Sequence, residues 1–284
     1  MTFDELNLQI LALSDNPNIE FFVMGYSTLN QPIYCVHLGS YEGKQLLIEG
    51  GIHAREYPAT QVVTKMAEYL STAEFNGGIY IIPLMNPDGV RLVLDGIDWI
   101  ECQKLKDYVL NINDGSLDFS QWKADIWAVD LNVNFDALWG QGSQNVFCPA
   151  PGNFVGFYPE SEREIRELID YSYSIRPDLT LSYHTKGNVI YYGFETLTPE
   201  ELARDAEIAN IISTINGYVP TKTVGSVGGY SDWVSEYLRV PAFTIEIAPV
   251  TAPTPVSSEY VEPAFQANKD VPIALLEYLN NSTQ

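Results

Sequence analysis

Residues 46–56 read Leu-Leu-Ile-Glu-Gly-Gly-Ile-His-Ala-Arg-Glu: an apolar run, two glycines, and then a His-x-x-Glu motif. The apolar run has the length and composition of a buried strand. Gly50 and Gly51 allow a tight backbone path at its carboxyl end. Side chains three positions apart on one helical turn point the same way, so His53 and Glu56 can converge on one cation. The pattern predicts a strand that delivers two metal ligands where it ends.

A second histidine leaves a second strand in the same way. Residues 179–183 are predicted to be a strand, and His184 follows directly. Ligands gather at the carboxyl ends of strands in open α/β sheets. Two histidines and one carboxylate, with a fourth position for water, form the ligand set of a hydrolytic zinc site. We therefore expect His53, Glu56 and His184 to hold one zinc ion per chain; the alternative is two ordinary loop histidines.

A glutamate in a third apolar strand supplies the catalytic candidate. Residues 241–248 read Pro-Ala-Phe-Thr-Ile-Glu-Ile-Ala, and strand alternation places Thr244 and Glu246 on one face. A carboxylate inside such a strand is costly unless it is paired or used. Beside an activated water it can take a proton and pass it to a leaving amine. Glu246 is therefore predicted to be the general base and acid.

Helical and strand patterns alternate along the rest of the chain, which indicates an α/β fold. We expect a single zinc peptidase domain over residues 1–284, with a mixed, mostly parallel twisted sheet and helices on both faces. Residues 95–157 are predicted to form long loops with short helices, and loops of that length are usually functional. The predicted helices are 3–13, 57–70, 161–174, 199–216, 231–238 and 261–279, and the predicted strands are 33–38, 45–49, 79–84, 179–183 and 242–247.

Composition narrows the class of protein. The chain has 46% apolar and 18% charged residues, as in ordinary globular proteins. Its net charge of −22 repels polyanions, so we expect no nucleic acid partner. No run reaches the about 18 apolar residues of a membrane span. Three cysteines without CxxC spacing indicate free thiols. The first ten residues lack a signal-peptide pattern, which predicts a cytoplasmic protein, or a secreted one if a signal peptide was trimmed.

Motifs along nearly the whole chain resemble the M14 metallocarboxypeptidase family. They run from Gly25-Tyr26-Ser27 through His-x-x-Glu to the strand of Glu246. Residues 86–89 (Asn-Pro-Asp-Gly) resemble the family's NPDG turn. Residues 228–233 (Gly-Gly-Tyr-Ser-Asp-Trp) resemble its Gly-Gly-x-x-Asp-Trp segment, and Glu246 follows at the family's interval of fourteen from the aspartate. The resemblance implies a zinc carboxypeptidase fold and peptidase activity.

Residues 122–124 and 129–135 resemble the region around the family's DLNRNF motif. The resemblance implies that Asp130 orients His53 through a hydrogen bond, a common arrangement behind metal ligands; the alternative is a cap on the loop. It also implies that Lys123 polarises the scissile carbonyl, where many members carry arginine.

Two positions depart from the family pattern. Val133 replaces the arginine that, with the preceding asparagine, here Asn132, grips a C-terminal carboxylate, and Val224 stands near the place of a tyrosine. Ordinary exopeptidase activity is therefore not expected. Residues 184–192 and 229–233 resemble bacterial γ-D-glutamyl-diamino acid peptidases, which cut peptidoglycan stem peptides before diaminopimelate. That branch implies a peptide or muropeptide substrate.

Diaminopimelate carries both charge signs on its side chain, so its pocket must offer both cations and acids or carbonyls. The candidate groups for its carboxylates and ammonium are Arg55, Arg91, Lys186, Arg239, Ser231 and Asp232.

Other functions remain as alternatives. They are a general zinc carboxypeptidase, a deacylase of the aspartoacylase type, and a non-catalytic cell-wall peptide binder. The match beyond residue 184 argues against the deacylase, and the presence of both His53 and Glu246 argues against the binder. The sequence leaves open the exact diamino acid, endo- or exopeptidase action, and the oligomeric state.

Overall fold

Three parallel strands form the centre of the sheet in this computed structural model, which describes residues 1–282. They are β3 (Gln45–Gly50), β5 (Leu179–Thr185) and β8 (Ala242–Ile247). All three are almost entirely buried, which is why they read as near-continuous apolar runs. Their carboxyl ends meet at one edge, because the strands pair in parallel and nearly in step.

The whole sheet has eight strands in the order β1-β2-β4-β3-β5-β8-β6-β7. Four of its seven strand pairings are parallel and three are antiparallel, so the predicted mixed, mostly parallel sheet is confirmed. The remaining strands are β1 (Glu20–Tyr26), β2 (Pro32–Gly39), β4 (Gly78–Ile82), β6 (Val189–Tyr192) and β7 (Val219–Lys222).

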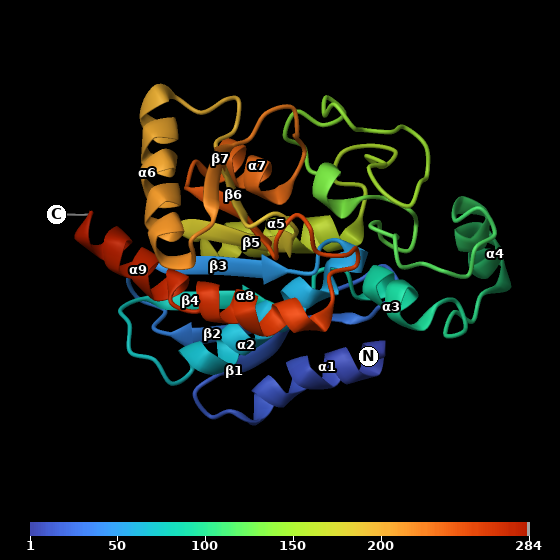
Figure 1. Cartoon of the computed structure of the whole chain (residues 1–284), viewed down its shortest axis with the longest axis horizontal. Coiled ribbons are helices and arrows are strands. Elements are labelled where there is room, and N and C mark those ends of the chain that lie inside the picture. Colours follow the sequence, from blue (N-terminus) through green and yellow to red (C-terminus); the bar gives the residue numbers. More distant parts are fainter. Residues whose placement is uncertain (283–284) are drawn as a thin grey trace.

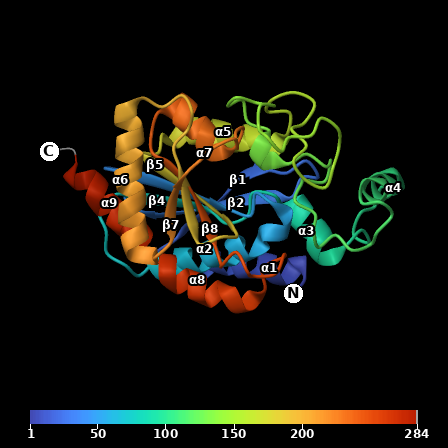
Figure 2. The same cartoon turned by 45° about the horizontal axis from the view of Figure 1, so that its top comes forward.

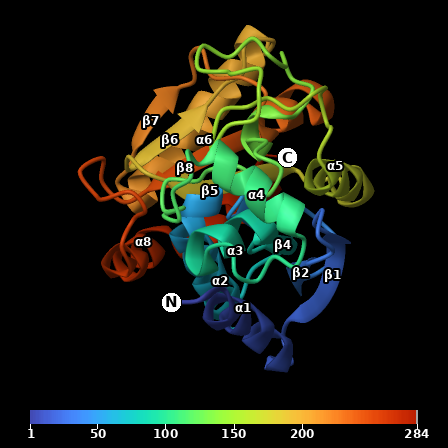
Figure 3. The ribbon, with the colours of Figure 1, turned by 90° about the vertical axis from the view of Figure 1, so that its right-hand side faces the viewer.

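Helices cover both faces of the sheet, as expected. Figure 3 shows α5 (Arg163–Ile175) on the opposite side from α2 (Tyr57–Leu70) and α8 (Val261–Asn268). The α2 face also carries α6 (Pro199–Asn216) and α9 (Val271–Asn281), and the α5 face carries the short helix α7 (Tyr230–Trp233). Each face has its own apolar core.

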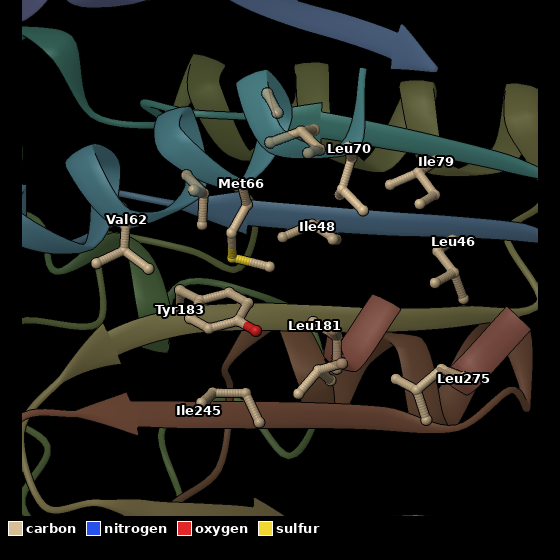
Figure 4. Packing of buried hydrophobic residues seen from close by; sticks show 14 of the residues in the cluster. Leu46, Ile48, Val62, Met66, Leu70, Ile79, Leu181, Tyr183, Ile245 and Leu275 are labelled. Atoms are coloured by element: carbon tan, nitrogen blue, oxygen red, sulfur yellow. The ribbon is translucent and has the colours of Figure 1, made fainter. Parts of the chain in front are cut away.

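The larger core lies under α2. Val62 and Met66, four positions apart on that helix, reach down to Ile48 on β3 and Tyr183 on β5 (Figure 4). Burying such side chains stabilises the fold by roughly 1.5–3 kcal/mol each. This packing holds β3 and β5 in the register on which the site depends.

The segment between β4 and α5 is less regular, and it carries two α-helices and the short 3-10 helix η3 (Leu131–Val133). Asn86 caps α3 (Pro87–Asp95): its Oδ1 accepts the Gly89 amide at 2.9 Å, and Pro87 occupies the first turn. The NPDG motif is therefore a helix start as well as a turn. Helix α4 (Gln103–Ile112) stands away from the sheet in Figures 1 and 2.

Buried carboxylates tie this segment to the rest of the molecule. Asp88 accepts the Leu29 amide at 2.8 Å, and Glu164 accepts the Thr28 amide at 2.8 Å. Within residues 1–282 neither forms an ion pair with a lysine or arginine. Burial raises the pKa of Asp88 to about 6 and that of Glu164 to about 7.

Some elements differ from the sequence predictions. Strand β1 was not predicted, because its residues show no alternation, and β6 and β7 are only four residues each. The helix predicted over 261–279 is interrupted at Lys269 and Asp270, after which α9 starts with Pro272 in its first turn. The helix predicted over 231–238 is α7 followed by the π-helical turn η4 (Val234–Leu238). Helix α1 (Phe3–Leu11) packs against α2 and α3.

Across residues 1–282, no helix has the length and apolar character needed to cross a membrane.

Candidate metal centre

Three side chains converge where β3 and β5 end. His53 lies shortly after the end of β3, Glu56 is the last residue of the short helix η2 (Ala54–Glu56), and His184 is the second-to-last residue of β5. His53 Nδ1 lies 3.1 Å from Glu56 Oε1, His184 Nδ1 lies 3.0 Å from Glu56 Oε2, and the two Nδ1 atoms are 3.1 Å apart. Gly51, at φ +67°, makes this exit possible, since a Cβ there would collide with Thr60.

The donor set fits a zinc ion. Ligands at about 2.0–2.1 Å in a tetrahedron stand roughly 3.3 Å from one another, close to the separations seen here. All three side chains are buried, and they form the one such cluster of His, Cys, Asp and Glu found within residues 1–282. Two imidazoles and a carboxylate leave the fourth position for water or substrate.

The electrostatics of the cluster suit a cation. Burial opposes ionisation of Glu56, but the charge and hydrogen bonds of His53 and His184 outweigh it and hold the pKa of Glu56 well below its usual range. Burial alone would lower the pKa of His184, yet the hydrogen bond and charge of Glu56 raise it to about 9. Protons and a metal ion therefore compete for the same imidazole nitrogens.

Asp130 lies behind His53. Its Oδ1 is 3.3 Å from His53 Nε2, and its Oδ2 accepts the Asn153 amide at 2.9 Å and lies 2.8 Å from Lys123 Nζ. Burial is opposed by the Lys123 and His53 charges, which hold the pKa of Asp130 well below its usual range. Oδ1 also accepts the Asn132 amide at 3.1 Å, so Asp130 caps its loop and faces His53 at the same time.

Glu246 reaches the cluster from β8. It pairs in register with His184 and lines the pocket in front of the proposed ligands. Burial, and then the negative charge of Glu56, raise the pKa of Glu246 to about 7. Its Oε2 has no hydrogen-bond partner among the residues the structure describes. A carboxylate in this state is suited to taking up and releasing a proton.

A pocket of about 340 Å³ opens in front of the cluster, within the range of small-ligand sites. Lys123 is the one lysine or arginine among its described lining residues. Two loops meet at its rim, where the Ser143 amide donates to the Gly225 carbonyl at 2.9 Å. Its polar lining residues include Asn132, Gln144, Asn145, Asn153, Tyr191, Ser231, Asp232, Ser235 and Thr244.

Ser231 and Asp232 both reach the pocket, as expected from the sequence. The Ser231 and Thr244 hydroxyls are 3.1 Å apart, and Asp232 Oδ2 accepts the Gly229 amide at 3.0 Å. Burial raises the pKa of Asp232 to about 7. Asn132 also lines the pocket, and its Oδ1 accepts the Tyr230 amide at 3.0 Å.

The structure does not bring the other basic candidates to this pocket. Their side chains have partners elsewhere, as follows. Arg55 donates to the Gln121 carbonyl at 3.1 Å, Arg91 lies over the rings of Phe3 and Trp99, Lys186 bonds the Ala252 carbonyl, and Arg239 pairs with Glu201. Of the cations expected from the sequence, Lys123 alone lines the pocket, and it too has a partner, Asp130.

Sequence reasoning missed one buried acid and several amides. Glu49, the penultimate residue of β3, is fully buried on the sheet face that also carries Ser182. The cost of burying a carboxylate in an apolar run, which singled out Glu246, applies equally to Glu49. The amides of Gln144, Asn145 and Asn153 lie in the irregular segment, where no periodic signal points to them.

The model of the zinc carboxypeptidase family matches residues 8–269. The chain is 33% identical over 257 residues to γ-D-glutamyl-L-diamino acid endopeptidase 1 of Lysinibacillus sphaericus, covering 85% of this chain and 63% of that protein. It therefore spans less than two thirds of that relative's length.

Solved structures share the fold. Bovine thrombin-activatable fibrinolysis inhibitor superposes with a TM-score of 0.77 at 18% identity, covering 99% of this chain and 98% of the other. Murein-tripeptide amidase of Escherichia coli O157 superposes with a TM-score of 0.57 at 20% identity, covering 94% and 91%. At these identities the likeness concerns the fold alone. With a family match over most of its length and a relative at 33% identity, this chain belongs to the zinc carboxypeptidase family, the M14 metallopeptidases.

Proposed function

We propose that this protein is a zinc-dependent peptidase that hydrolyses the γ-D-glutamyl-diaminopimelate bond of peptidoglycan stem peptides. His53, Glu56 and His184 hold the zinc, and Glu246 is the general base and acid. The observation that carries the proposal is the convergence of three buried side chains in front of a pocket that a second carboxylate, Glu246, also lines. The two imidazole Nδ1 atoms lie 3.1 Å apart, and each lies 3.0–3.1 Å from an oxygen of Glu56.

Zinc in such a site lowers the pKa of water and polarises a carbonyl. Side chains of the protein transfer the proton, stabilise the developing negative charge and orient the ligands. Glu246 takes the proton of the attacking water and delivers it to the leaving amine. Lys123 faces the pocket as a point charge that favours negative charge on the scissile oxygen, and Asp130 holds both Lys123 and His53 in place.

The pocket favours a substrate other than an ordinary peptide C-terminus. Val133 is 9% exposed and lines the pocket where the family's carboxylate-binding arginine is expected. Lys123, the one lysine or arginine that lines the pocket, forms an ion pair with Asp130. An incoming C-terminal carboxylate therefore meets hydroxyls and amides rather than a guanidinium.

The amphoteric side chain of diaminopimelate suits the same lining. Asp232, with Ser231 and Thr244, offers an acidic and hydroxylic end for its ammonium group, and the Asn and Gln amides suit carboxylate oxygens. The relative in Lysinibacillus sphaericus is a γ-D-glutamyl-L-diamino acid endopeptidase, which supports this choice of bond.

The test is mass spectrometry of L-Ala-γ-D-Glu-diaminopimelate after incubation with the zinc-loaded protein. We expect release of L-Ala-D-Glu. The same peptide with an α-linked glutamate is the matched control for the bond, and peptides ending in Phe or Lys are the controls for general carboxypeptidase activity. Glu246→Gln controls for contaminating peptidases. Efficient trimming of the ordinary peptides, with the muropeptide left intact, would replace this proposal with that of a general carboxypeptidase.

A further inference from the structure

Glu49 is a buried acid that the proposed reaction does not use. It lies in the central strand β3, fully buried, and within residues 1–282 neither carboxylate oxygen has a hydrogen-bond partner. Burial raises its pKa, and the nearby His184 and Ser182 side chains oppose that shift. A buried carboxylate without partners is costly, so its position calls for an explanation.

Strand register places Glu49 beneath the proposed metal site. Glu49 pairs with Ser182 across β3 and β5, and His184 follows Ser182 by two residues on the same face. Neighbouring strands lie about 4.7–4.9 Å apart, and residues two apart along a strand are about 6.6 Å apart, so both side chains are within reach of a glutamate. The three buried polar side chains therefore lie together on the sheet face that α7 covers.

His184 has a second ring nitrogen that does not face the other ligands. Its Nδ1 faces the other two ligand atoms at 3.0 and 3.1 Å, so Nε2 points away from them. Nε2 is buried and, like the Ser182 hydroxyl, has no partner among the described residues. His53 Nε2 also has no well-aligned hydrogen bond among the described residues, but it has a carboxylate beside it, since Asp130 Oδ1 lies 3.3 Å away. Metal-bound histidines almost always donate that second N–H to a carboxylate, carbonyl or water.

We propose that Glu49 is the positioning residue of His184, acting through one bound water that also contacts Ser182. The water accepts the Nε2 proton of His184 and donates to the Glu49 carboxylate, since the two side chains form no direct ion pair. Three buried polar groups without partners supply the two to four hydrogen-bonding contacts that a structural water needs. The inference rests on the proposed zinc site.

Zinc affinity, measured by competition with a chelator, is the primary readout. Glu49→Leu removes the acceptor, so zinc binding should weaken on the order of 10- to 100-fold. Glu49→Gln keeps an acceptor without the charge, and its loss should be smaller. Glu246→Gln should bind zinc as the wild type does, because Glu246 lines the pocket and is not one of the proposed ligands. Thr180→Val is the matched structural control. Thr180 is buried on the same face of β5, two residues before Ser182 and therefore further from the site, so the variant also replaces a buried polar side chain with an apolar one.

The unfolding free energy of the metal-free variants separates positioning from a structural role. Removing a buried, unpartnered acid should leave it unchanged or raise it. Weaker zinc binding together with undiminished metal-free stability therefore supports the proposal. Wild-type affinity in both Glu49→Leu and Glu49→Gln overturns it while leaving the proposed function intact. A wild-type protein that binds no zinc overturns both.

Discussion

Val133→Arg restores a guanidinium to the pocket at the position where ordinary family members carry one. The valine side chain lines the pocket, so an arginine there points into solvent-filled space. A charge-assisted hydrogen bond contributes about 1.5–3 kcal/mol. Each 1.36 kcal/mol corresponds to a factor of ten in rate, so the variant should gain about 10- to 150-fold in kcat/KM for substrates that end in a free carboxylate.

The assay compares each peptide acid with its C-terminal amide, which lacks the charge but keeps the shape. For the wild type we expect the two kcat/KM values to be similar, and for Val133→Arg we expect a strong preference for the acid. Val133→Met controls for added bulk. An acid-to-amide ratio that stays the same in Val133→Arg, with the variant folded and zinc-loaded, would refute the reasoning from this position.

Three further outcomes are expected. Glu246→Gln should keep its zinc content by elemental analysis yet lose activity on the order of 100-fold or more, and loss of zinc would instead make Glu246 a ligand. Asp130→Asn should weaken zinc binding by roughly 10- to 100-fold in chelator competition, because its amide orients His53 less firmly; unchanged affinity would reduce Asp130 to a loop cap. Glu164 has a native pKa of about 7 against an ordinary 4.5. The native state therefore binds the extra proton between these values, and the unfolding free energy falls as pH rises through this window. The shift corresponds to about 3 kcal/mol. Glu164→Gln should flatten that part of a urea-denaturation pH series, and an unaltered slope would contradict the assignment.

The central sheet was predictable because its strands are buried on both faces. The runs around Leu47, Leu181 and Ile245 are apolar and bounded by turns, and the amphipathic pattern of α2 is unambiguous. The outer strands were not predictable. Strand β1 lies at the edge of the sheet, and its burial does not alternate regularly, while β6 and β7 are too short to show a period.

The site divides along similar lines. The structure brings together His53, Glu56, His184 and Glu246 as predicted from positions at strand ends, where topology limits the possible geometry. Substrate contacts depend on which way long flexible side chains point. Arg91, for example, follows the NPDG motif closely yet turns to the Trp99 ring, and no local pattern encodes that choice. The basic residues were therefore the weakest part of the prediction.

The proposed zinc site depends on the register in which β3 pairs with β5. A slip of one residue between these strands would turn every side chain of β5 to the opposite face. His184 would then point under α2, and Tyr183 would take its place beside His53. Parallel strands joined by long crossovers form late and slowly, so off-register pairings are a real hazard for this fold. Because only the native register completes the set of ligands, metal binding would favour the correctly aligned sheet over its shifted competitors.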